Sequence, residues 1–328
     1  MLIIALIAAF VFYNYQITAP ASRSGEVVNF EIKSGEGVHQ ISQRLFQQGL
    51  IRNQFYFELY VWLHDWQRNF LVGPYELSAK MSIGEIVRKL TNPGDSETAI
   101  TILEGWNNRE IAEYLAENNL GNQEEFLNLV SRNLGQFVSE YDFLVDKPSS
   151  VDLEGYLFPD TYRVFKNATA LEITKKMLDN FGAKLTQEMR VDIKNAGKSI
   201  FEVITLASII EKEVRAEADM KMVADIFNKR LEQGIALQSD ATVNYVTGKG
   251  LVQPTAADIA VDNLYNTYKY RGLPPGPIAN PGLQAIKAAI YPTPNQYYYF
   301  LTTAEGEVIY SQTYQEHLKN KSVYLNNK

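Results

Sequence analysis

Residues 199–234, SIFEVITLASIIEKEVRAEADMKMVADIFNKRLEQG, decide the fold of the C-terminal half of this chain. The stretch has a helical pattern but is too long and too mixed for one straight helix. We therefore predict a break near 216–219 and two packed helices, the second ending at Gly234. Apolar residues recur along that second helix at the spacing of a core face: Met222, Val223, Ile226, Phe227 and Leu231. The helix pair is predicted to be the centre of the larger domain.

Two carboxylates stand at the end of the apolar run LASIIEKE (206–213), although acids are among the residues least often fully buried. On a helix, Glu213 lies over aliphatic residues of the preceding two turns, with Glu217 one turn ahead. Burial and a like charge both raise the pKa of a carboxyl, and a carboxyl that stays protonated near neutral pH can act as a general acid. Glu211 has Arg215 at i+4 and is predicted to stay ionised. The alternative is that both acids are solvated on the helix surface.

Three later motifs could surround such an acid: LQSDATV (237–243), YNTY (265–268) and LPPGPIANPG (273–282). Four prolines in the last of them fix φ and predict a rigid loop. Tyr and Asn side chains are common partners of sugar rings and N-acetyl amides. The alternative is a loop with a purely structural role. The sequence contains no Gly-rich phosphate loop and no nucleophile elbow.

Composition excludes several classes of function. The chain has 328 residues, a net charge of -7 and no cysteine. An acidic chain without clustered Lys and Arg is not predicted to bind nucleic acid. Without cysteine, disulfides, thiolate metal sites and Cys nucleophiles are excluded. The three histidines, His39, His64 and His317, are far apart and lack metal-ligand spacing, so no metal and no cofactor are predicted.

The N-terminal segment is apolar. Residues 1–13, MLIIALIAAFVFY, are uncharged, and the first charged side chain is that of Arg23. Residues 1–22 are predicted to be a transmembrane anchor, since about 20 such residues span a bilayer. The basic flank that orients such segments is missing. A cleaved signal peptide is the alternative, and both place the rest of the chain outside the cytoplasm.

The remaining organisation is predicted to be α+β. Residues 26–95 read as strand, helix, helix and strand, followed by a helix that the S-x-x-E capping box at Ser82 opens. Such a module could bind carbohydrate or another protein. Residues 96–165 form a connecting subdomain that ends in LEGYLFPDTYRVF (153–165), predicted as a strand with exposed rings or as a groove lining. Residues 166–328 form the mixed α+β catalytic domain, closed by a β-hairpin over QYYYFLTT and EVIYS.

The ordered motifs EGYLFPDTY, LASIIEKE, IFNKRL, LQSDATVNY, YNTY, GLPPGPIANPG and YYYFLTT resemble the endolytic murein transglycosylase family, the MltG or YceG-like proteins. The resemblance runs from about residue 26 to the C-terminus. It implies a single-pass protein of the inner (cytoplasmic) membrane with a LysM-like module over 26–95 and an extracytoplasmic or periplasmic catalytic domain. It also implies that the substrate is the glycan strands of nascent peptidoglycan. Candidate partners are peptidoglycan synthases, and a candidate role is the termination of glycan elongation.

The resemblance places the catalytic acid of the family on Glu213. A lytic transglycosylase needs one acid, because the C6 hydroxyl of N-acetylmuramic acid (MurNAc) attacks C1 of the same sugar and leaves a 1,6-anhydro end. Membership of the motifs makes six residues candidates for substrate binding: Gln238, Asp240, Asn266, Tyr268, Pro275 and Asn280.

Two other functions remain open from the residues. A non-catalytic peptidoglycan-binding or divisome scaffold protein would use the N-terminal module and the aromatic loops. A hydrolase of the lysozyme type would need a second acid, such as Asp240, within about 5 to 9 Å of Glu213. Only the lytic transglycosylase leaves anhydro ends on its products.

Overall fold

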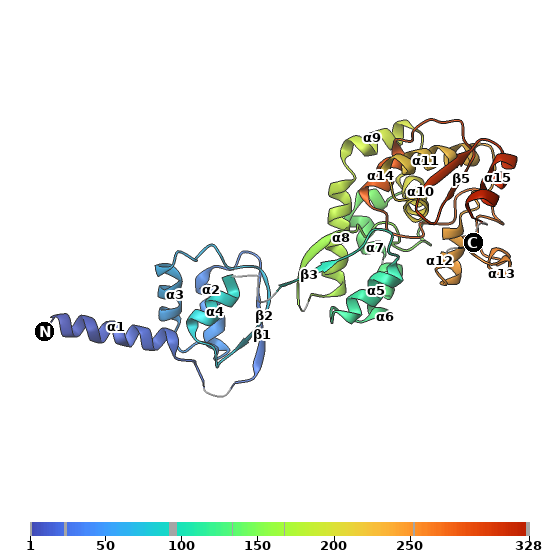
Figure 1. The fold of residues 1–328 in the computed structure, drawn as a ribbon. Coiled ribbons are helices and arrows are strands. Elements are labelled where there is room, and N and C mark those ends of the chain that lie inside the picture. The colour runs from blue at the N-terminus through green and yellow to red at the C-terminus, as the bar shows by residue number, and fades with distance from the viewer. Residues whose placement is uncertain are drawn as a thin grey trace. The chain divides into compact units, whose positions relative to one another are not determined.

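The computed structural model describes residues 2–22, 25–91, 97–132, 134–166, 168–251 and 253–325, and it is a mixed α+β fold with small sheets (Figure 1). The chain forms two compact units. Unit 1 comprises residues 1–99 and 163–167, and unit 2 comprises 100–162 and 168–328. This division is coarser than the four predicted domains, whose bounds stay a prediction.

Unit 1 has the predicted order of strand, helix, helix, strand and helix after the N-terminal helix α1 (Leu2–Thr18). Strands β1 (Val27–Ile32) and β2 (Gly73–Ser78) pair antiparallel, with Phe30 opposite Tyr75. The helices are α2 (Val38–Gln47), α3 (Gln54–Leu63) and α4 (Ile83–Thr91). The order of elements is confirmed, whereas the likeness to a LysM module stays a prediction.

The core of unit 1 follows from the alternation of its strands and the helical spacing of its helices. The strands contribute Phe30, Ile32, Tyr75 and Leu77, and the helices contribute Ile41, Leu45, Phe57, Val61, Ile86, Val87 and Leu90. The predicted capping box opens α4, because Glu85 accepts the backbone N–H of Ser82 at 2.8 Å while the Ser82 hydroxyl accepts that of Glu85 at 3.3 Å. Within the described ranges, no helix combines the length and the apolar character needed to cross a membrane.

A two-stranded sheet of β3 (Glu97–Thr101) and β4 (Thr161–Phe165) contains the boundary between the two units. The segment before β4 departs from the prediction. Tyr156 and Phe158 before β4, and Tyr162 within it, are all buried, so these rings are neither exposed nor lining a groove. They pack inside unit 2, where Tyr156 lies 5.2 Å from the Phe181 ring.

Unit 2 is mainly helical. Its helices before the centre are α5 (Asn108–Glu117), α6 (Gln123–Arg132), α7 (Leu134–Glu140), α8 (Ala170–Lys184) and α9 (Gln187–Asn195). The central and later helices are α10 (Ile200–Glu213), α11 (Glu217–Glu232), α12 (Asp240–Thr247), α13 (Ala256–Ile259), α14 (Leu283–Ile290) and α15 (Tyr314–Tyr324). The predicted hairpin is confirmed as β5 (Tyr299–Thr302) paired antiparallel with β6 (Val308–Ser311).

The first helix of the predicted pair, α10, lies at the centre of unit 2. It packs against α11, α12 and α14, and every residue from 203 to 210 is buried. Ser199 caps its N-terminus by accepting the N–H of Glu202, whose carboxylate accepts the N–H of Ser199 in return. The helix ends at Glu213, three residues earlier than the predicted break begins. The buried helix therefore ends in an acid.

Candidate active site

Glu213 is the last residue of α10, where the backbone becomes extended at Val214. Its side chain is partly buried. The hydroxyl of Ser239, the residue just before α12, donates a hydrogen bond of 2.5 Å to Glu213 Oε1. The end of one helix and the beginning of another thus meet at this carboxyl.

Burial raises the pKa of Glu213 to about 7, and the negative charge of Asp240 adds to the rise. The hydrogen bond from Ser239, the charge of Arg230 and the backbone at Ala241 act in the opposite direction. A carboxyl with a pKa near 7 can both donate and accept a proton at neutral pH, which is the property a general acid-base group needs.

The charge that raises this pKa is not the predicted one. Glu217 was expected one turn ahead of Glu213, but α10 ends at Glu213 and α11 begins at Glu217, so the two are not on one helix. Glu217 instead forms an ion pair with Lys221 at 2.6 Å, and this pair lowers its pKa. The rise in the pKa of Glu213 agrees with the helical-face argument, but the neighbouring negative charge is that of Asp240 and not that of Glu217.

The prediction for Glu211 was also wrong. Arg215 lies beyond the end of α10 and is exposed, so the i, i+4 geometry is lost. The Glu211 carboxylate accepts the backbone N–H of Gly282 at 2.9 Å, at the N-terminus of α14. Burial, with the charge of Glu104, raises the pKa of Glu211, whereas the prediction had a neighbouring cation that favours the ionised form. Glu211 attaches the proline-rich loop to α10.

Ser239 is held by a buried cluster of hydroxyls that the sequence analysis did not identify. Its backbone N–H donates to Thr267 Oγ1 at 3.0 Å, and its carbonyl accepts the hydroxyl of Thr242 at 2.7 Å. The hydroxyls of Thr242 and Thr267 lie 2.9 Å apart. These contacts join LQSDATV to YNTY. The Ser-Asp pair at 239–240 was the available signal, because both residue types are common at the start of a helix.

Asp240 and Tyr268 form a second pair beside the acid, since the phenol of Tyr268 donates to Asp240 Oδ1 at 2.5 Å. Both side chains are partly exposed. The neighbouring Gln238 has an exposed side chain and a φ of 53°, a left-handed conformation uncommon for residues other than glycine. Its backbone N–H donates to the carbonyl of Thr267 at 3.2 Å. The structure therefore brings Gln238, Asp240 and Tyr268 together near Glu213.

Arg230 is a buried cation close to the site, and the sequence analysis gave it no role. Its Nε donates to the carbonyl of Tyr298 and its Nη1 to that of Leu237, each at 2.8 Å. Its guanidinium lies 5.0 Å from the centre of the Tyr299 ring. A positive residue four positions after Ile226, on the apolar face of α11, was the available signal. Arg230 ties α11 to the hairpin and to the segment before α12.

Two of the predicted binding residues hold backbone groups instead of facing solvent. The amide of Asn266 is buried, donates to the carbonyls of Ile259 and Val261 at 2.8 Å each, and accepts the N–H of Tyr268 at 3.1 Å. Pro275, by contrast, is exposed on its loop.

Asn280 is fully buried, with 0% exposure. Its Oδ1 accepts the backbone N–H groups of Gly155 and Leu157, each at 2.9 Å. Its Nδ2 donates to the carbonyl of Trp106 and to Glu154 Oε1, each at 3.0 Å. Glu154 also accepts the N–H of Asn108, the first residue of α5, and burial raises the pKa of Glu154 well above its usual range. One amide joins three separate segments.

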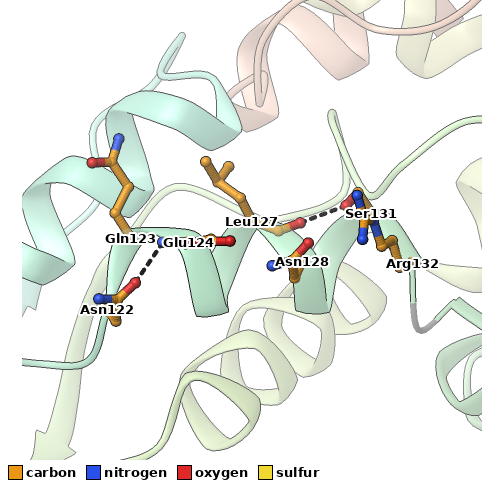
Figure 2. Close-up of a pocket in the computed structure, with 7 residues that line it drawn as sticks. All are labelled: Asn122, Gln123, Glu124, Leu127, Asn128, Ser131 and Arg132. Carbon is orange, nitrogen blue, oxygen red and sulfur yellow. Dashed lines mark hydrogen bonds between the residues drawn. The ribbon is translucent and has the colours of Figure 1, made fainter.

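Two further features concern metal binding and the surface pocket. In the part of the chain that the structure describes, no group of three or more His, Asp or Glu residues could hold a metal ion. A surface pocket of 420 Å³ lies over α6 in unit 2 (Figure 2). It is lined by Asn122, Gln123, Glu124, Leu127, Asn128, Ser131 and Arg132, so none of the predicted site residues contributes to it.

Comparison with known proteins gives consistent results. The model of the YceG-like family matches residues 30–323. An endolytic murein transglycosylase of Bacillus subtilis is 32% identical over 96% of this chain and 90% of its own length. One from Streptococcus pneumoniae is 28% identical over 100% of this chain and 65% of its own length. A crystal structure of a YceG-like protein from Listeria monocytogenes has a TM-score of 0.63 and 33% identity, and the match covers 90% of this chain and 99% of that one.

The neighbours of Glu213 should shift the pH dependence of any activity that needs its proton. Asp240→Asn removes a negative charge, so the pKa of Glu213 falls and the alkaline limb of the pH-rate profile moves to lower pH. Ser239→Ala removes a hydrogen bond that favours the carboxylate, so the pKa of Glu213 rises and the limb moves to higher pH. Glu217→Gln is the matched control and should leave the limb in place. If the alkaline limb moved in Glu217→Gln but not in Asp240→Asn, Asp240 would not be the charge that raises the pKa of Glu213.

Asn280→Ala should destabilise unit 2. The substitution leaves two buried N–H groups without their acceptor, at about 1–3 kcal/mol each, so the free energy of unfolding should fall by about 2–6 kcal/mol. Urea unfolding measures this change. Asn128→Ala on α6 is the control, with an expected change within about 0.5 kcal/mol. Equal stability of the two variants would show that the Asn280 bonds do not hold the segments together.

Proposed function

The chain belongs to the YceG-like family, and from this premise we propose that the protein is an endolytic lytic transglycosylase that cleaves the glycan strands of peptidoglycan. Relatives from two organisms bear the name endolytic murein transglycosylase, and the match to the first covers most of both chains. The observation that carries the proposal is the partly buried carboxyl of Glu213, which accepts a hydrogen bond from the Ser239 hydroxyl and has a pKa of about 7. This supports an enzyme over a scaffold protein, because proton transfer requires a carboxyl with a pKa near 7 and glycan binding does not.

The proposed reaction uses Glu213 twice. First, its carboxyl donates a proton to the glycosidic oxygen between MurNAc and N-acetylglucosamine. The bond from that oxygen to C1 of MurNAc breaks with both electrons leaving on oxygen, and positive charge develops at C1. The carboxylate then takes the proton of the C6 hydroxyl of the same MurNAc, and the C6 oxygen bonds to C1. The product has a 1,6-anhydro end and Glu213 has regained its proton, so no water is consumed.

Surrounding residues have separate proposed roles. Ser239 donates to the carboxylate formed between the two steps, and Arg230 offsets part of its charge. Gln238, Asp240 and Tyr268 have at least partly exposed side chains near the acid and are proposed to contact the sugars, with Pro275 on the adjoining loop. Asn266 and Asn280 are proposed to shape this surface from behind, since their amides are bonded to buried backbone groups.

A hydrolase of the lysozyme type is less well supported. Its second carboxylate must activate water or attack the sugar. Asp240, whose Oδ1 accepts the phenol of Tyr268, is the candidate for that part, whereas the relatives are named as transglycosylases. The products distinguish the two reactions: mass spectrometry of cleaved glycan strands should find anhydro ends, and reducing ends would instead indicate hydrolysis.

Glu213→Gln should abolish glycan cleavage while the fold and glycan binding remain. A general acid-base group contributes about 10²- to 10⁴-fold to a rate, which sets the expected loss. Digestion of intact, newly made glycan strands measures it.

Glu211→Gln is the matched control, two residues away on the same helix. We expect a milder loss, because the amide oxygen of Gln can still accept the N–H of Gly282. An inactive Glu211→Gln beside an active Glu213→Gln would assign the acid to Glu211. Full activity of both variants would refute the enzyme and favour the scaffold.

The cellular setting is proposed from the sequence and the family. Action on peptidoglycan places unit 2 outside the cytoplasm. A single-pass anchor at residues 1–22 in the cytoplasmic membrane is supported by the uncharged N-terminal run that forms α1. Peptidoglycan synthases are the proposed partners and termination of glycan elongation is the proposed role, because an enzyme that cleaves newly made strands acts on the product of those synthases.

Cell fractionation tests the anchor. The chain should appear in the membrane pellet, resist extraction by high salt and be released by detergent, because apolar insertion is insensitive to salt. Recovery of a soluble protein that begins near Ser22 would show a cleaved signal peptide instead.

A further inference from the structure

Helix α3 of unit 1 has two apolar faces. Phe57 and Val61, four residues apart, are fully buried in the core of the unit. Phe55 and Trp62 are 62% and 64% exposed, and Leu59 between them is partly exposed. These three residues lie at i, i+4 and i+7, which places them on one face of the helix. The second face therefore presents large apolar side chains to the surroundings at regular helical spacing.

This exposed face is not needed to fold unit 1, because the core is filled from the other face. The one acid within α3, Glu58, contacts the ring of His39 at 2.9 Å and the hydroxyl of Ser42 at 2.5 Å. A surface helix that is apolar on an outward face marks a site of contact with a partner or a lipid surface. The absence of charge on the face favours an apolar partner.

The same apolar surface continues onto α1. The Phe12 ring lies 6.0 Å from that of Tyr56, and the Tyr56 ring lies 5.3 Å from that of Phe55. Phe10 and Phe12 are themselves exposed on α1. Figure 1 shows α3 beside the C-terminal half of α1 and running crosswise to it. Whatever covers this part of α1 also reaches the exposed face of α3.

Cationic and aromatic groups stand where the two helices meet. Arg52, just before α3, has its guanidinium 5.7 Å from the centre of the Tyr15 ring and donates to the Tyr15 hydroxyl at 3.4 Å. Arg68 follows the helix and is exposed. Trp and Tyr rings at the interface, with Arg beside them, are typical of segments that lie in the headgroup layer of an anionic bilayer.

We propose that α3 lies in the headgroup layer of the membrane that α1 enters, with Phe55, Leu59 and Trp62 in contact with lipid. The proposal rests on the proposed anchoring of residues 1–22 and is independent of the glycan chemistry of unit 2. The contact would fix the orientation of unit 1 at the membrane surface, because α1 and α3, which run crosswise to each other, then both contact the bilayer.

The test uses the absence of cysteine from the chain, which allows one thiol to be introduced at will. Phe55→Cys and Trp62→Cys are each labelled with a nitroxide in the full chain, which is reconstituted in phosphatidylcholine and phosphatidylglycerol vesicles. The spin label reports its collisions with oxygen, which enters lipid, and with a nickel chelate, which stays in water. Glu31→Cys is the control, on an exposed position of β1, and Figure 1 draws α2 and α4 between β1 and α3.

The expected result is a severalfold lower collision rate with the nickel chelate, and a higher one with oxygen, at positions 55 and 62 than at position 31. Vesicle flotation is measured on the same samples. A chain that floats while the labels at 55 and 62 stay as accessible to the chelate as the label at 31 overturns the inference and leaves the anchor intact, and points to a protein partner for this face. A chain that does not float overturns both the anchor and the contact of α3 with lipid. Cleavage of glycan by the labelled variants confirms that unit 2 is folded.

Discussion

The buried amide of Asn280 is the interaction on which the arrangement of unit 2 depends. It bonds to backbone groups at 106, 155 and 157 and to the Glu154 carboxylate, so it joins the start of unit 2, the aromatic segment and the proline-rich loop. Glu154 extends the connection to the N-terminus of α5. Because the hydrogen bonds to Gly155, Leu157 and Glu154 are buried, water cannot replace these partners, and loss of one leaves the others unsatisfied. The proline-rich loop is thereby fixed against α10, where Glu211 accepts the N–H of Gly282.

The candidate acid owes its properties to the place where a buried helix ends. Residues 203–210 of α10 are covered on all sides, and the helix ends at Glu213 with its carboxyl still partly buried. Burial disfavours the charged form, whereas the Ser239 hydroxyl and the Arg230 cation favour it, and the balance leaves the pKa near 7. A deeper site without these two partners would hold the proton too tightly for the second step. An exposed carboxyl would already have lost its proton at neutral pH, before the first step.

Most residues around the acid act by holding other residues. Thr242 and Thr267 fix the backbone of Ser239, Asn266 fixes the segment that presents Tyr268, and Arg230 joins α11 to the hairpin. Such buried networks give a surface a single geometry, because each member satisfies the polar groups of its neighbours.

The sequence by itself determined several of the elements and selected the candidate acid, Glu213. Helical spacing over 199–234 predicted two helices, the capping box at Ser82 predicted the start of α4, and alternation with a Glu-Gly turn predicted the β5–β6 hairpin. These signals are local, since they depend on residues within one or two turns of each other. The same local argument selected Glu213 over Glu211, because only its neighbours on the helix are all aliphatic.

Only the tertiary structure decided which groups surround that acid. The pairs Glu213–Ser239, Asp240–Tyr268 and Glu211–Gly282 join residues 26, 28 and 71 positions apart. No local spacing encodes such pairs, and the early end of α10 removed both of the helical neighbours that spacing had predicted, Glu217 and Arg215. The roles of Asn266 and Asn280 changed for the same reason: an amide in a motif reads as a sugar ligand until its burial is known. Residues on the same helix were enough to select Glu213 as the candidate acid. Its pKa depends on residues that are distant in sequence, because burial is a property of the whole fold.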